Sequence, residues 1–137
     1  MAHRILKGSG HRTVRISDQP TYLPKASRLG HGKHKASPGD FVRWGDGDSD
    51  GYSGWGRVVG RITSHFDDLE DCTGFLVVIK VASTGAFGHA LFVDPAHVEI
   101  CEPVDRSREF LTRLLYATPA QLTRYLESGY DTRVMAE

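Results

Sequence analysis

The sequence is poor in cysteine, has no long apolar run and carries no net charge. Its two cysteines, Cys72 and Cys101, form no CxxC pair, so two packed thiols are a better interpretation than a disulfide. The longest apolar run, Phe75 to Ile79, is far shorter than the roughly 20 residues that cross a bilayer. The first residues, MAHRILKGSGHR, lack the apolar core of about 7 to 15 residues that a signal peptide has. We therefore expect a chain without membrane contact that is not secreted by a signal peptide and lies in the cytoplasm or within a virion or other particle.

The composition is that of one soluble globular domain, but its charges are unevenly placed. The chain has 137 residues, of which 39% are hydrophobic and 25% are charged. Residues 1–40 contain eight Lys or Arg and two Asp, a net charge of +6, so the rest of this neutral chain carries −6. Such a split is typical of a basic arm joined to an acidic body.

Residues 1–37 are predicted to be an extended basic arm and not a folded unit. They contain four glycines and two prolines, and only Thr13–Ile16 alternates as a strand does. The stretch 28–35, RLGHGKHK, has no apolar face with which to offset the loss of chain entropy on folding. Such an arm gains its order by packing on its own body or by docking on a partner within an assembly.

Residues 38–103 show the pattern of a small β-barrel. Five short stretches, apolar or alternating, are separated by turn residues such as Gly, Pro and Asp. In the second stretch, Val58, Gly60 and Ile62 are predicted on one face and Arg57 on the other. The third is apolar throughout, as in a strand that is buried on both faces. The predicted strands are 41–44, 56–64, 74–81, 89–93 and 98–101, with one tight turn at 94–97.

Three stretches of this region, PGDFVRW, GWGRVVGRI and FVDPAHVEI, resemble the Src-homology-3-like barrels, a group that includes KOW and Tudor-type modules. In that family a long loop separates the first two strands and a single helical turn precedes the last, and residues 38–103 have both features. The resemblance implies a five-stranded barrel that binds peptides, nucleic acid or other proteins and seldom catalyses a reaction. It also implies aromatic side chains along the ligand groove, a role open to Trp44, Tyr52 and Trp55.

Residues 104–137 are predicted to form a helical hairpin and tail. The stretch 107–117 places its large apolar side chains in an i, i+1, i+4, i+5 stripe, as in a helix packed on one face. Thr118, Pro119 and Gln121 then form the signature of a capped second helix, which Gly129 ends. The apolar faces either pack on the barrel, which we favour, or form a docking surface for another subunit.

The loop after the first strand of the barrel resembles half of a calcium site. Asp46, Asp48 and Asp50, followed by glycine, occupy positions 1, 3 and 5 of a calcium-binding loop. Position 12, where such loops carry a bidentate glutamate, is Arg57, and position 9 is Gly54. We therefore predict a solvated turn and no bound metal.

The remaining histidines and cysteines do not form a convincing reaction centre. His31 and His34 have ligand spacing, but neither a cysteine nor a carboxylate stands near them in the sequence. His89 and His97 would be partners for Cys101 as a nucleophile, but a cysteine at a strand end is more often a packing residue. No stretch matches a phosphate-binding fingerprint. We predict a protein that is not an enzyme and needs no cofactor.

Two kinds of function remain. The first is a structural protein whose basic arm docks on neighbouring subunits, including copies of itself, in an assembly such as a phage or virion particle. The second is a nucleic-acid-binding module whose arm contacts phosphates and whose loop aromatics stack on bases. An inhibitor of some other enzyme also stays open. The residues predicted to contact the partner are Arg4, Lys7, Arg12, Arg15, Arg28, Lys33, Lys35, Trp44, Tyr52 and Trp55.

Overall fold

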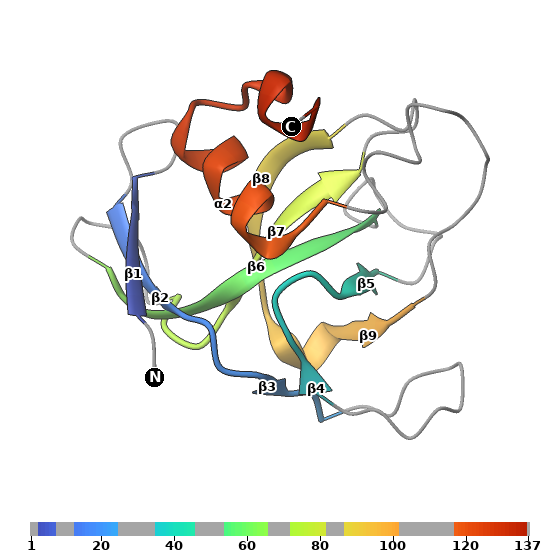
Figure 1. The fold of residues 1–137 in the computed structure, drawn as a ribbon. Coiled ribbons are helices and arrows are strands. Elements are labelled where there is room, and N and C mark those ends of the chain that lie inside the picture. The colour runs from blue at the N-terminus through green and yellow to red at the C-terminus, as the bar shows by residue number, and fades with distance from the viewer. Residues whose placement is uncertain are drawn as a thin grey trace.

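The computed structural model describes residues 3–7, 13–24, 35–45, 54–65, 72–81, 87–101 and 117–136 (Figure 1). This part of the chain is mainly β, as the sequence predicts, and contains one α-helix, the second of the two predicted for the C-terminal hairpin. Its strands are β1 (His3–Lys7), β2 (Thr13–Ser17), β3 (Thr21–Tyr22), β4 (Lys35–Ala36), β5 (Phe41–Trp44), β6 (Gly54–His65), β7 (Leu76–Val81), β8 (Phe87–Val93) and β9 (Val98–Ile100). Its helices are η1 (Pro95–His97), α2 (Pro119–Glu127) and η2 (Thr132–Ala136).

The five strands predicted for residues 38–103 are all present and form an antiparallel meander. Strands β5, β6, β7 and β8 pair in sequence order, and β9 returns beside β5 after the short helix η1. Strand β6 is 12 residues long and also pairs with β2 through its second half. Within the described part of the chain, β1, β8 and β9 each have a strand neighbour on one side, so the sheet does not close and the predicted five-stranded barrel is not confirmed.

The N-terminal segment differs from the extended arm that the sequence predicts. Strands β1 and β2 form a hairpin that adds to β6, and β3 and β4 form a separate two-stranded ribbon. Val14 and Ile16 of β2 are 3% and 0% exposed, so this strand belongs to the core. The alternation of apolar and polar residues at 13–16 does predict this strand. Its stability comes from distant partners on β6 and α2, which a reading of neighbouring residues does not reveal.

Two apolar clusters lie on the two faces of the central strands. One joins the sheet to α2 and contains Val14, Ile16, Val59, Ile62, Val77, Ile79, Val81, Ala117, Leu122, Tyr125 and Leu126. The other contains Leu23, Ala36, Val42, Trp44, Val58, Leu76, Val78, Val98 and Ile100. Strand β7 contributes alternate residues to each cluster, which confirms the prediction of a strand buried on both faces.

A bulge in β6 changes which residues share a face. Val58 lies in the second cluster, whereas Val59 and Ile62 both lie in the first. The register with β7 shifts between Val58 and Gly60, which reverses the alternation beyond that point. The predicted common face of Val58, Gly60 and Ile62 is therefore wrong. A Cβ at Gly60 would lie 2.8 Å from Cδ1 of Ile16 and 2.9 Å from the carbonyl oxygen of Ser17, so glycine permits the close approach of β2.

Helix α2 begins and ends where the sequence indicates. Thr118 Oγ1 accepts a hydrogen bond from the Gln121 backbone N–H at 3.1 Å, and Gln121 Oε1 accepts one from the Thr118 N–H at 2.8 Å, which confirms the capping box. At the other end Gly129 has a φ of 76°, and its N–H donates to Leu126 O at 3.1 Å. The N–H of Tyr130 donates to Tyr125 O at 2.8 Å, which completes a Schellman motif. Of the helix predicted at 107–117, residues 107–116 lie outside the described residues, and Ala117 precedes the N-cap of α2.

Candidate interaction surface

The ribbon of β3 and β4 presents an exposed aromatic residue beside a cation. Tyr22 pairs across the ribbon with Lys35, and Thr21 pairs with Ala36. The tyrosine is 64% exposed and the lysine is also exposed, whereas Thr21 and Ala36 are 4% and 1% exposed. Residues directly opposite each other in an antiparallel pair share a face, so Tyr22 and Lys35 lie together on the outer face of the ribbon.

This pair suits contact with a macromolecule. A tyrosine ring supplies a rigid apolar surface with a polar end, and tyrosine is enriched at protein interfaces for that reason. An adjacent lysine ammonium attracts carboxylates or phosphates. Leu23, the next residue along, is 1% exposed and anchors the ribbon in the second core cluster, so the pair is held on a packed support.

Tyr22 is not among the residues that the sequence pattern predicts to contact a partner. The signal is present, because Thr21, Tyr22 and Leu23 lie between two prolines and alternate in burial. A strand of two residues is too short for this alternation to stand out from the glycine- and proline-containing segment around it.

The structure places only part of the predicted basic set. Arg15 is exposed on β2, in the large sheet, and Lys35 is exposed on β4, in the small one. Arg4 and Lys7 belong to β1, where the backbone alone is described. The other three members, Arg12, Arg28 and Lys33, lie outside the described residues.

Of the three aromatic residues predicted to contact a partner, Trp44 is instead part of the core. It is 8% exposed and lies in the second cluster, on the same side of β5 as the fully buried Val42. The period of two in β5 explains this, because Val42 and Trp44 both point inward. Trp55 is half-buried and its ring centroid lies 5.5 Å from that of Phe41. Tyr52 lies outside the described residues.

The candidate metal ligands lie outside the described residues, whereas both cysteines lie within them. The candidate ligands include Asp46, Asp48 and Asp50. No group of three or more His, Cys, Asp or Glu side chains that could hold a metal ion occurs among the described residues. Both cysteines are described, and no disulfide joins them.

A buried arginine ties three segments together. Nε of Arg57 donates to the carbonyl oxygen of Gly39 at 2.8 Å, and Nη2 donates to that of Ala117 at 2.9 Å. The guanidinium carbon lies 4.7 Å from the centroid of the Phe41 ring. Burial lowers the pKa of Arg57 to about 10, although the charge of Asp40 raises it, so the side chain stays protonated at neutral pH. As predicted, the side chains of Arg57 and Val58 lie on opposite faces of β6. The start of α2 covers the face that carries Arg57.

A second polar and aromatic cluster joins the end of α2 to β8. The centroid of the Tyr130 ring lies 4.8 Å from that of the His89 ring and 5.4 Å from that of the Tyr125 ring, and both pairs are edge to face. The Tyr130 hydroxyl accepts a hydrogen bond from the Ala90 N–H at 3.3 Å, and the Tyr125 hydroxyl donates to Gly88 O at 3.5 Å. Burial, and the charge of Tyr130 to a lesser degree, raise the pKa of Tyr125.

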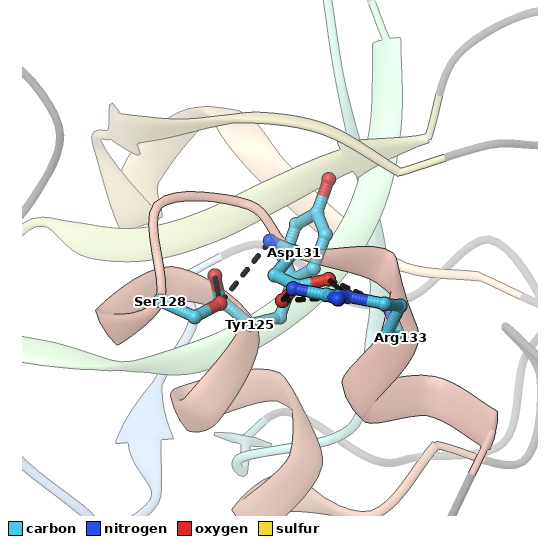
Figure 2. Close-up of polar contacts among 4 residues, drawn as sticks. All are labelled: Tyr125, Ser128, Asp131 and Arg133. Atoms are coloured by element: carbon cyan, nitrogen blue, oxygen red, sulfur yellow. Dashed lines mark hydrogen bonds and ion pairs between the residues drawn. The ribbon is translucent and has the colours of Figure 1, made fainter.

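The chain just beyond this cluster is fixed by a local network, shown in Figure 2. The Ser128 hydroxyl donates to Tyr125 O at 3.0 Å and accepts from the Asp131 N–H at 3.1 Å. Nε of Arg133 donates to Asp131 Oδ1 at 3.0 Å, and Nη2 donates to Oδ2 at 2.8 Å. The side-chain and backbone hydrogen bonds from Arg133 lower the pKa of Asp131 to about 2. Arg133 is 89% exposed, so this pair orients the chain at the surface.

Comparison with protein-family models, characterised proteins and solved structures finds no match to this chain. None of the helices in the described ranges is long and apolar enough to span a membrane.

Proposed function

We propose that this protein is a non-enzymatic interaction module of the Src-homology-3-like type that assembles with acidic protein surfaces, including copies of itself. The strand order supports the module type. Strands β5 to β8 form a meander, η1 stands before the last strand, and β9 pairs with the first strand of the meander. In this proposal the hairpin of β1 and β2 is an addition to the five-stranded unit, packed against the far half of β6.

The proposal rests mainly on the exposed side chains of the outer face of the β3–β4 ribbon. Tyr22 is the most exposed of the large hydrophobic side chains reported for the described residues, and Lys35 stands directly across from it. Tyrosine is enriched among the residues that contribute most to binding, and the ammonium of a lysine beside it attracts acidic groups. The ribbon belongs to the part of the sequence with a charge of +6, whereas the remainder carries −6.

This charge division favours head-to-tail contact between copies. A basic ribbon on one copy meets the acidic portion of the next, and such a heterologous contact forms rings or filaments, as in a phage or virion particle. Each exposed ion pair contributes about 0.2 to 1 kcal/mol, so the contact must combine several pairs with burial of the Tyr22 ring. The association should therefore weaken as salt is added.

Single-stranded nucleic acid is the second candidate, and the same pair supports it. A base stacked on an aromatic side chain is stabilised by about 1 to 3 kcal/mol, and a neighbouring lysine contacts the phosphate. Tyr22 and Lys35 supply both groups on one face, and Arg15 is a further exposed cation. The acidic remainder of the chain favours protein over nucleic acid as the partner.

Sedimentation velocity of the full chain tests the proposal. We expect concentration-dependent association at about 0.05 M salt that declines at about 0.5 M. Tyr22→Ala and Lys35→Glu should each weaken it. His97→Ala, in η1, is the control for the loss of an exposed ring, and Arg124→Glu, on the surface of α2, is the control for the same change of charge.

The outcomes separate the two candidates. Association that Tyr22→Ala and Lys35→Glu reduce, while both controls retain it, supports the assembly proposal. A monomer under all conditions that shifts the mobility of single-stranded DNA or RNA with a steep dependence on salt would replace it with the nucleic-acid candidate. A monomer that shifts neither and binds no acidic polypeptide, with polyglutamate as the probe, would refute both.

A further inference from the structure

Among the described strands, β8 lies at an edge of the sheet, and tyrosine side chains occupy part of that edge. In the described residues β8 pairs with β7 alone. The N–H of Ala90 and the carbonyl of Gly88 point away from β7, because each meets a tyrosine hydroxyl from the C-terminal segment. Figure 1 shows this segment, α2 and the turn that follows it, beside β8. We call Tyr125 and Tyr130 the tyrosine cover.

Tyr130 adopts an unfavourable backbone conformation that places its side chain against β8. Its φ is 70°, in the left-handed region, which is unfavourable for a residue with a large side chain. Gly129, with a φ of 76°, already ends the helix, so helix termination does not require a second left-handed residue. The gain from this conformation is contact with β8, where the ring meets His89 and the hydroxyl meets Ala90.

Exposed strand edges are templates for pairing with another chain, and proteins commonly block them. The tyrosine cover is such a block, since two hydroxyls take the positions that the backbone groups of an added strand would take. Leu91, on the same strand, is 37% exposed, so apolar surface lies next to the covered backbone.

We propose that the edge of β8 is a second self-association surface, which the tyrosine cover closes and whose opening lets β8 of two copies pair antiparallel about a twofold axis. A second copy is the favoured occupant because an isologous pair would bury Leu91 from both sides and extend both sheets. The chain has no net charge, so long-range repulsion between copies is small. This surface deepens the proposed self-assembly but is separate from the β3–β4 ribbon.

Amide hydrogen exchange at Ala90 tests the cover itself. Tyr130→Gly removes the ring and hydroxyl while keeping a residue that suits a positive φ, and Tyr130→Phe removes the hydroxyl alone. In dilute protein, Tyr130→Phe should speed exchange of the Ala90 amide by about tenfold, as expected for the loss of one net hydrogen bond. Tyr130→Gly should speed it further. Tyr22→Phe, far from β8 in sequence and on the separate ribbon, is the matched control and should change nothing there.

Sedimentation equilibrium tests whether a second copy of the chain pairs with β8 once the tyrosine cover is removed. Both Tyr130 variants are made in the Lys35→Glu background, so that the ribbon of the proposed function does not contribute. We expect a dimer that forms as concentration rises, tolerates high salt and restores slow exchange at Ala90. Adding Leu91→Lys, a charge on the edge strand, should abolish it.

Each result bears on one step of the proposal. Unchanged exchange at Ala90 in Tyr130→Phe and Tyr130→Gly would refute the cover. Faster exchange with a monomer at all concentrations would refute the pairing of β8 with β8. If Tyr130→Gly does not fold, Tyr130→Phe decides both points alone. Failure of the Tyr22 and Lys35 variants to affect assembly would refute the proposed function and leave this surface standing.

Discussion

The guanidinium of Arg57 donates a hydrogen bond of 2.9 Å to the carbonyl oxygen of Ala117, a residue 60 positions further along the chain. Ala117 is the last residue before the N-cap of α2, so the contact holds the start of the helix against β6. The same side chain donates to Gly39, in the turn before β5. One cation therefore fixes the relative positions of the helix, the central strand and the first turn of the meander.

Truncation of Arg57 should lower the stability of the fold substantially. Arg57→Ala leaves two carbonyl groups without this donor, and we expect a loss of about 3 kcal/mol from charged hydrogen bonds of this kind. Arg57→Met keeps much of the volume and removes the cost of burying a charge, so its loss should be smaller. Urea denaturation of the full chain measures both. Equal losses in the two variants would show that the hydrogen bonds, which both variants lose, and not the packing, which Arg57→Met keeps, are the main contribution of this residue.

The sequence predicts the local features of this fold well. Period-two alternation, apolar runs and turn residues identify all five strands of residues 38–103, and the capping signature identifies the start of α2. These signals are local because the backbone conformation of a turn or cap is set by residues within a few positions of one another.

The features that the sequence did not reveal depend on contacts between distant residues. Val14 is a core residue only because β6 and α2 cover β2, and Arg57 is buried only because α2 begins above it. The bulge at Val59 and Gly60 leaves no clear mark on the sequence pattern. The exposure of Tyr22 is not predicted for a related reason. A strand of two residues forms only because it pairs with another strand and packs on the core, and neither contact is visible in the local sequence.

Replacement of Gly60 by alanine should strain the contact between β6 and β2. A Cβ there would come within 2.8 Å of Ile16 Cδ1 and 2.9 Å of the Ser17 carbonyl oxygen, both too close without movement. We expect a loss of about 1 to 3 kcal/mol, as for overpacked cores. The measurement is the free energy of unfolding in urea.

A double-mutant cycle with Ile16→Val identifies the source of that strain. Ile16→Val removes the Cδ1 atom and should cost about 0.5 to 1.5 kcal/mol alone. If the Ile16 side chain carries the strain, Gly60→Ala costs less in the Ile16→Val background than in the native one. Strictly additive losses would assign the strain to the Ser17 carbonyl, which no side-chain change removes.

Loss of the capping box should destabilise α2 by a predictable amount. Thr118→Ala removes the oxygen that accepts from the Gln121 N–H, and we expect a loss of about 1 kcal/mol. Thr118→Asp retains an acceptor at the N-cap and should restore most of that loss. Thermal unfolding of the three proteins at neutral pH provides the comparison. A Thr118→Ala protein as stable as the native chain would mean that the Thr118 hydroxyl contributes little to the fold.

The ion pair of Asp131 with Arg133 should make stability depend on pH only in acid. Arg133 lowers the pKa of the Asp131 carboxyl to about 2 in the folded chain, whereas an unfolded aspartate titrates at about 3.9. Because the folded pKa is the lower one, the stabilising contribution is complete above about pH 4 and is lost as the pH falls towards the folded pKa.

Carbon NMR of the Asp131 carboxyl group measures that titration directly. We expect a midpoint near pH 2 in the native chain and a return towards the ordinary value in Arg133→Gln, which keeps a polar side chain, shorter than arginine, and removes the charge. Added salt should raise the native midpoint as well, since the Arg133 side chain is 89% exposed. The melting temperatures of the native chain and of Asp131→Asn should differ at neutral pH and converge at low pH. A native midpoint near 4 would show that the pair does not persist in solution, and the chain after α2 would then lack the contact that orients it.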